Sequence, residues 1–249
     1  NFQDRAYELN KAAAEVARQA ADAVDRLVLV AGSMGPTGEL FEPMGELTHP
    51  SAVESFTAQA QGLSDGGADI LWIETMSDLA EVRAAVEAAQ SVSDLPICTT
   101  LSFDSKGRSM MGVTPRQAVR ELSALGVAAI GGNCGNGLDE IEGVIDQMHD
   151  ACPDVVLIAK ANAGIPKWKG DELYYDGTPR LMAEYAQRAR ALGARIIGSC
   201  CGSGPAHIEA MAEALAPDSP TLTVARGYEV PDEPAVKASS GRRRRRRAG

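Results

Sequence analysis

The stretch LVLVAGSMGPTG at residues 27–38 decides the fold. A continuous apolar run at 27–31 leads directly into a glycine-rich segment at 32–38, and residues 4–26 before it repeat Ala, Leu and Val at helical spacing. An apolar run of this kind predicts a strand that is buried on both faces and ends at a loop. The stretch therefore predicts one helix-to-strand step of an α/β protein.

The same alternation continues along the chain. Six strands are expected at residues 27–31, 68–74, 96–103, 127–133, 155–159 and 195–199, and seven helices at 4–26, 50–66, 78–91, 115–125, 138–151, 179–192 and 205–215. Apolar strands that alternate with amphipathic helices predict a parallel sheet covered by helices, either an open doubly wound sheet or a (β/α)8 TIM barrel. Polar and glycine-rich residues follow the strands throughout, and this favours the barrel.

A barrel of this kind has eight strands, whereas this chain begins inside a helix and offers six. We therefore expect the first strand, the first helix and the second strand to be absent from it. Residues 1–227 are assigned to this N-terminally incomplete barrel, and residues 228–249, which end in six arginines, to a disordered tail.

Composition excludes several classes of partner. The 249 residues are 45% hydrophobic, which is enough to bury one large core. Their net charge is −10, and the acidic body repels the phosphates of nucleic acid. No apolar run is long enough to span a membrane, and no signal peptide opens the chain. We expect a cytoplasmic protein that binds neither nucleic acid nor membrane.

The five cysteines include an adjacent pair, Cys200 and Cys201, which cannot easily form a relaxed disulfide with each other. This pair and Cys134 each follow a predicted strand, and a barrel would bring the three sulfurs to one mouth. Three thiolates with a fourth position open are typical of a reactive zinc site. Buried packing thiols are the alternative for these three, and packing is our interpretation of Cys98 and Cys152.

Other polar and aromatic residues have two interpretations each. Glu74 ends an apolar strand, where it can receive the α-ammonium group of an amino acid or simply cap the next helix. Asn133 and Asn162 either line the mouth or serve as turn residues. Trp168 can border the mouth, where an aromatic face attracts quaternary ammonium groups. His207 is expected to pack or to cap its helix.

Together these motifs resemble the homocysteine S-methyltransferase family, which includes betaine–homocysteine methyltransferase and the homocysteine module of cobalamin-dependent methionine synthase. The resemblance covers almost all of residues 1–215. It rests on residues 30–38, 110–115, 132–135 and 198–202, on Glu74-Thr75 and on His207.

The resemblance implies a TIM barrel in which Cys134, Cys200 and Cys201 hold a catalytic Zn²⁺ that binds the thiol of homocysteine. It also implies that Glu74 receives the α-ammonium group and that Thr75 and Asn133 belong to the substrate site. There are two departures. The family's opening strand, with an Asp-Gly segment that helps to hold the substrate, has no counterpart here, and Ala161 stands where the family usually has proline.

The expected reaction is transfer of a methyl group from a small onium donor such as betaine to the zinc-bound thiolate of homocysteine, which gives methionine. The alternative is a homocysteine-binding subunit of a split cobalamin-dependent methionine synthase that acts with a separate corrinoid or folate protein. A barrel whose cysteines only pack is the third interpretation.

Overall fold

The computed structural model describes residues 2–104, 106–135, 137–219 and 222–224. The predicted tail at 228–249 lies outside this range. After a short 3-10 helix, Gln3–Arg5, the helices are α1 Ala6–Asp22, α2 His49–Asp65, α3 Leu79–Val92, α4 Pro115–Ser123, α5 Leu138–Ala151, α6 Pro179–Leu192 and α7 Pro205–Ala214. The strands are β1 Ala31–Met34, β2 Ile70–Met76, β3 Ile97–Leu101, β4 Ala129–Cys134, β5 Leu157–Ala161, β6 Pro166–Lys169, β7 Glu172–Tyr175 and β8 Ala194–Ser199.

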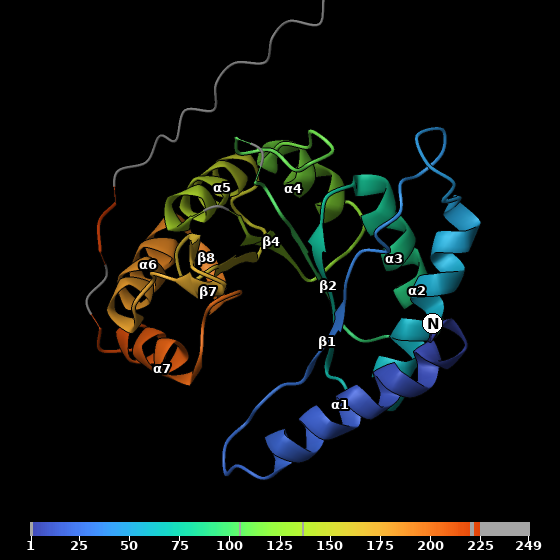
Figure 1. Ribbon diagram of the computed structural model, residues 1–249, viewed down its shortest axis with the longest axis horizontal. Helices are drawn as coiled ribbons and strands as arrows, with labels where there is room; N and C mark the ends of the chain where they lie inside the picture. The colour runs from blue at the N-terminus through green and yellow to red at the C-terminus, as the bar shows by residue number, and fades with distance from the viewer. Residues whose placement is uncertain (1, 105, 136, 220–221, 225–249) are drawn as a thin grey trace, which may run out of the picture.

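Six strands form one parallel sheet in the order β1-β2-β3-β4-β5-β8. Figure 1 shows the helices following one another around the outside of this curved sheet. Among the described residues, β1 pairs only with β2 and β8 pairs only with β5, so the two edges do not meet. The arrangement confirms the predicted α/β class and the six predicted parallel strands, which curve as the wall of a barrel does.

Local sequence signals fix where the helices begin. The hydroxyl groups of Thr48, Thr114 and Thr178 each accept a backbone N–H from the first turn of α2, α4 and α6, and a proline follows in that turn. A side-chain cap of this kind stabilises a helix by about 1 kcal/mol, and proline in the first turn sacrifices no hydrogen bond. Each cap therefore fixes the residue at which its helix begins.

Alternate residues of the strands pack in two separate hydrophobic clusters. Leu71 and Ile73 of β2 belong to the large outer cluster between sheet and helices. Strand side chains alternate between faces, so the residues between them point to the concave side. There they form a small inner cluster with Trp72, Cys98, Ala129 and Ile158 as its buried members.

The first predicted strand is wrong in its bounds. Strand β1 begins at Ala31, and Leu27 and Leu29 are exposed. The Asp69 carboxylate accepts the Val30 N–H at 2.7 Å, and the ladder with β2 starts at Ala31, opposite Ile70. An apolar run alone could not reveal that a side chain would cap this edge.

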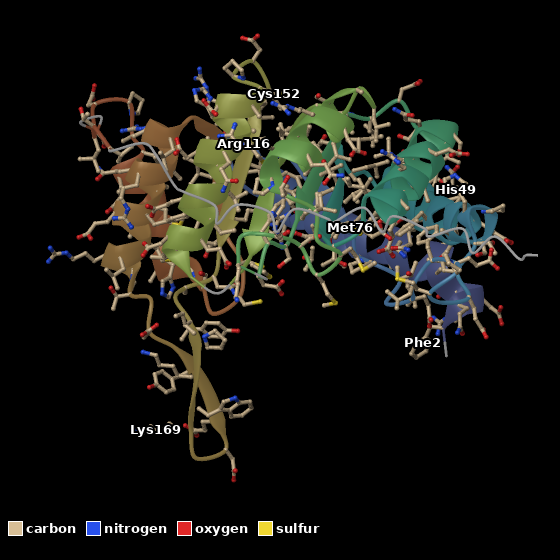
Figure 2. The ribbon with its side chains drawn as sticks, turned by 90° about the horizontal axis from the view of Figure 1, so that it is seen from above. Phe2, His49, Met76, Arg116, Cys152 and Lys169 are labelled. Carbon is tan, nitrogen blue, oxygen red and sulfur yellow. The ribbon has the colours of Figure 1, made fainter. Side chains whose placement is uncertain are left out.

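The antiparallel hairpin β6–β7 was not predicted. It follows the loop after β5 and projects from the body of the molecule, as Figure 2 shows with Lys169 at its tip. Its residues are mostly exposed, so no run of buried apolar residues marks its strands. Among the described residues, no helix combines the length and the apolar character needed to cross a bilayer.

Candidate metal and thiol site

Three cysteines meet at the carboxyl ends of β4 and β8. Cys134 is the last residue of β4, and Cys200 and Cys201 directly follow β8. The Sγ atoms of Cys134 and Cys200 lie 3.2 Å apart, those of Cys200 and Cys201 lie 4.0 Å apart, and all three lie within 4.8 Å of one another. The structure thus brings together the three sulfurs that the sequence analysis singled out.

The backbone reaches this arrangement through left-handed residues and an amide bridge. Cys134 has a φ of 62°, which is uncommon for a residue with a side chain, and Gly202 has a φ of 78°. Asn162, in the loop after β5, accepts the Cys201 N–H at 3.0 Å and donates to the Gly135 carbonyl at 3.0 Å. One side chain therefore ties the two cysteine loops together.

A second amide joins β2 to β4 beneath the sulfurs. The fully buried Asn133 side chain accepts the Thr75 N–H at 3.0 Å and donates to the Thr75 hydroxyl at 2.8 Å. It also donates to the Cys200 sulfur at 3.8 Å. Thr75 has a φ of 62°, an outlier for a β-branched residue, and the Asn133 amide holds it there. Asn133 thus links the end of β2 to the thiol cluster.

The thiols carry unequal proton affinities. The hydrogen bond from Cys134, with further help from the Asn133 amide, lowers the pKa of Cys200 to about 5. The same hydrogen bond, together with burial, raises the pKa of Cys134. The pair therefore releases one proton easily and holds the next. A thiophilic divalent cation would replace that retained proton, because coordinated thiols are deprotonated. This donor set suits a metal ion.

The other two cysteines lie apart from this cluster. Cys98 is a member of the inner cluster, and burial raises its pKa to about 11. Cys152 ends α5 and packs, partly buried, against the outer cluster. Both contacts agree with the packing interpretation.

Glu74 lies on the concave side of the sheet, near the carboxyl end of β2. Its Oε1 accepts the Ser33 hydroxyl at 2.6 Å, and its Oε2 lies 2.5 Å from the Nζ of Lys160. The Lys160 ammonium also sits 5.1 Å from the centre of the Trp72 ring. Ser33 and Lys160 were not predicted as partners of Glu74. The available signal was a lone lysine at the end of an apolar stretch. It indicates a partner for Glu74 only when the structure places β5 opposite β2 across the concave side.

The base of the β6–β7 hairpin contacts the second cysteine loop. Gly202 leaves no room for a side chain there, because an added Cβ would lie 2.2 Å from Cγ of Tyr175. Burial and the neighbouring Cys201 raise the pKa of Tyr175. Trp168, by contrast, is 71% exposed on the projecting part of the hairpin. His207 caps α7, since its Nδ1 accepts the Gly204 N–H at 3.0 Å.

Comparison with known proteins identifies the family of this chain. The model of the family described as homocysteine S-methyltransferase matches residues 1–215. Methionine synthase from Mycobacterium tuberculosis (strain ATCC 25618 / H37Rv) is 31% identical over 224 residues, which are 86% of this chain and 18% of that protein. Methionine synthase from Mycobacterium leprae (strain TN) is 30% identical over the same shares. The chain thus spans about a fifth of the length of these curated relatives.

Solved structures show the same relationship. The apo form of the homocysteine methyltransferase MmuM from Escherichia coli matches with a TM-score of 0.69 and 25% identity, over 85% of this chain and 74% of that chain. Its metallated form matches with a TM-score of 0.66 and 25% identity, over 83% and 70%. The parallel sheet and its helices share the TIM-barrel fold of these solved structures. The chain belongs to the homocysteine S-methyltransferase family, which confirms the predicted family.

Proposed function

We propose that this protein transfers a methyl group to the sulfur of homocysteine and so forms methionine, at a Zn²⁺ ion held by Cys134, Cys200 and Cys201. The observation that carries the proposal is the convergence of three sulfurs within 4.8 Å at the carboxyl ends of the strands. Barrel enzymes place their chemistry at that end. Three protein thiolates with a fourth position left for a substrate thiol are the ligands of a reactive zinc site.

A thiol is a poor nucleophile while it is protonated, and its usual pKa of about 8.5 keeps it mostly protonated at neutral pH. Zinc, when bound, lowers the pKa of a coordinated thiol, so that the sulfur attacks as a thiolate. The residues of this chain hold the cysteine loops in place and orient the substrate. Asn133 and Asn162 fix the cysteine loops through the hydrogen bonds described above. Glu74, two residues before the end of β2, is proposed to receive the α-ammonium group, with Thr75 beside it.

Two methyl donors are compatible with this function. A small onium compound such as betaine is the donor predicted from the sequence. The similarity to methionine synthases supports the alternative, in which a separate corrinoid protein delivers the methyl group. Incubating the purified, zinc-loaded protein with homocysteine and either betaine or methylcobalamin, and measuring methionine, distinguishes the two donors.

Replacing Cys200 tests the zinc site itself. Cys200→Ser should reduce bound zinc well below one ion per chain and abolish methionine formation, because two thiolates and a hydroxyl form a much weaker site for zinc than three thiolates. Cys152→Ser is the matched control, since it makes the same change at a cysteine outside the cluster and should keep both. Zinc content and activity that survive in Cys200→Ser would contradict the proposal.

A further inference from the structure

The six strands of the parallel sheet carry three charged side chains, Glu74, Lys160 and Arg195. Arg195 is exposed near the start of β8, at the opposite end of the strands from the cysteines. Glu74 and Lys160 both lie toward the carboxyl ends, where β2 and β5 approach the site. The sheet therefore supplies one anionic and one cationic side chain to the mouth of the barrel.

Both charged groups point to the concave side. Glu74 shares a face of β2 with Trp72, and Lys160 shares a face of β5 with Ile158, because alternate strand residues point the same way. Trp72 and Ile158 are buried members of the inner cluster. Each charged side chain is 22% exposed, so the pair lies partly buried and remains accessible to a solute.

The position of Lys160 relates it to the thiol cluster. Lys160 pairs in register with Asn133, and the next residue along, Ala161, pairs with Cys134. One strand residue corresponds to a rise of about 3.3 Å. The side chain of Lys160 therefore starts one residue below the level of Cys134. Its ammonium meets Glu74, whose neighbour Thr75 is joined through the Asn133 amide to the Cys200 sulfur.

The ion pair leaves hydrogen-bonding capacity unused on both partners. An ammonium group has three N–H donors, and within the described part of the chain Lys160 donates only to Glu74. A carboxylate can accept about four hydrogen bonds, and Glu74 accepts those from Ser33 and Lys160. The pair can therefore accept a further anion at one partner and a further cation at the other.

We propose that Lys160 binds the α-carboxylate of the acceptor amino acid, so that Glu74 and Lys160 together recognise its zwitterionic end. This inference rests on the proposed function and adds a specificity-determining residue to it. A zwitterion adds no net charge, and each of its charges meets an opposite charge on the protein. A thiol without a carboxylate leaves Lys160 paired with Glu74 alone.

Thiol ligands that lack one charged group test the assignment. The ligands are homocysteine, γ-mercaptobutyrate, which lacks the amino group, and γ-mercaptopropylamine, which lacks the carboxylate. Their affinities for the zinc-loaded protein are measured by isothermal titration calorimetry, without any methyl donor. Lys160→Met should weaken binding of homocysteine and of γ-mercaptobutyrate by about ten- to a hundredfold, the value of a charge-assisted hydrogen bond. Binding of γ-mercaptopropylamine should not weaken.

Matched variants separate this role from a structural one. Lys160→Arg keeps the charge and should restore most of the carboxylate preference. Lys11→Met makes the same change on the outer helix α1 and should leave all three affinities unchanged. Glu74→Gln should show the reverse selectivity, with homocysteine and γ-mercaptopropylamine weakened and γ-mercaptobutyrate spared.

The outcomes distinguish the inference from the function beneath it. If unaltered, zinc-loaded protein fails to bind homocysteine, the proposed function falls, and the inference falls with it. If unaltered protein binds homocysteine but Lys160→Met weakens all three ligands equally, or none, the inference alone is overturned. A Lys160 that only positions Glu74 would instead reproduce the Glu74→Gln pattern, in which homocysteine and γ-mercaptopropylamine are weakened and γ-mercaptobutyrate is spared. That pattern would also overturn the inference.

Discussion

The Asn133 side chain gives the most direct test of how the site is built. Asn133→Ala removes the acceptor for the Thr75 N–H and the donor to the Thr75 hydroxyl. Each such hydrogen bond contributes about 1 kcal/mol, and a buried N–H left without a partner costs a further 1–3 kcal/mol, roughly. We therefore expect the free energy of unfolding to fall by about 3 to 5 kcal/mol.

Urea unfolding followed by circular dichroism measures this change, on metal-free protein so that zinc binding does not contribute. Thr75→Val is the graded control. It keeps a β-branched residue at the left-handed φ and keeps the N–H bond, but loses the hydroxyl bond, so it should cost only about 1 kcal/mol. Equal losses in the two variants, or losses below about 0.5 kcal/mol in both, would refute the idea that the Asn133 amide holds β2 to β4.

Two further predictions concern Cys98 and Gly202. Burial raises the pKa of Cys98 from 9.0 to about 11, so the folded protein holds this proton more tightly than the unfolded chain does. The free energy of unfolding should fall by about 2 kcal/mol as the pH rises from 9 to 11, and the slope should flatten in Cys98→Ala if the thiol is its cause. Gly202→Ala should weaken zinc binding, because the new methyl group meets Tyr175 and the φ of 78° is unfavourable for alanine. Adding Tyr175→Ala should restore part of that affinity, and no recovery would mean that the hairpin does not press on the cysteine loop.

The regular part of the fold could be predicted because its signals are local. The strands β2, β3 and β4 are largely buried on both faces, so each appears in the sequence as a nearly continuous apolar run. The predicted starts of α4 and α6 at residues 115 and 179 match the observed ones, where a threonine cap and the proline after it lie within the first turn. The cysteine cluster could be predicted because barrel strands bring their carboxyl ends together.

The remaining features depend on contacts between distant residues. The Glu74–Lys160 pair joins residues 86 positions apart, and neither strand indicates the other's register. The hydrogen bond between the Val30 N–H and the Asp69 carboxylate joins residues 39 positions apart, and the apolar run around Leu29 does not indicate it. The β6–β7 hairpin has little buried surface, so hydrophobic pattern carries no information about it.

The helix-facing side of the sheet carries most of the hydrophobic core, and the concave side carries a small inner cluster together with the residues that we propose recognise the ligand. Residues of one parity on β2 and β5 hold the helices, while their neighbours of the other parity surround the ligand end of the barrel. A mutation that alters ligand preference therefore changes a residue whose contacts with the helices are few. For protein engineering, the strand residues that face the concave side form a compact library, and the helix-facing positions are best left fixed.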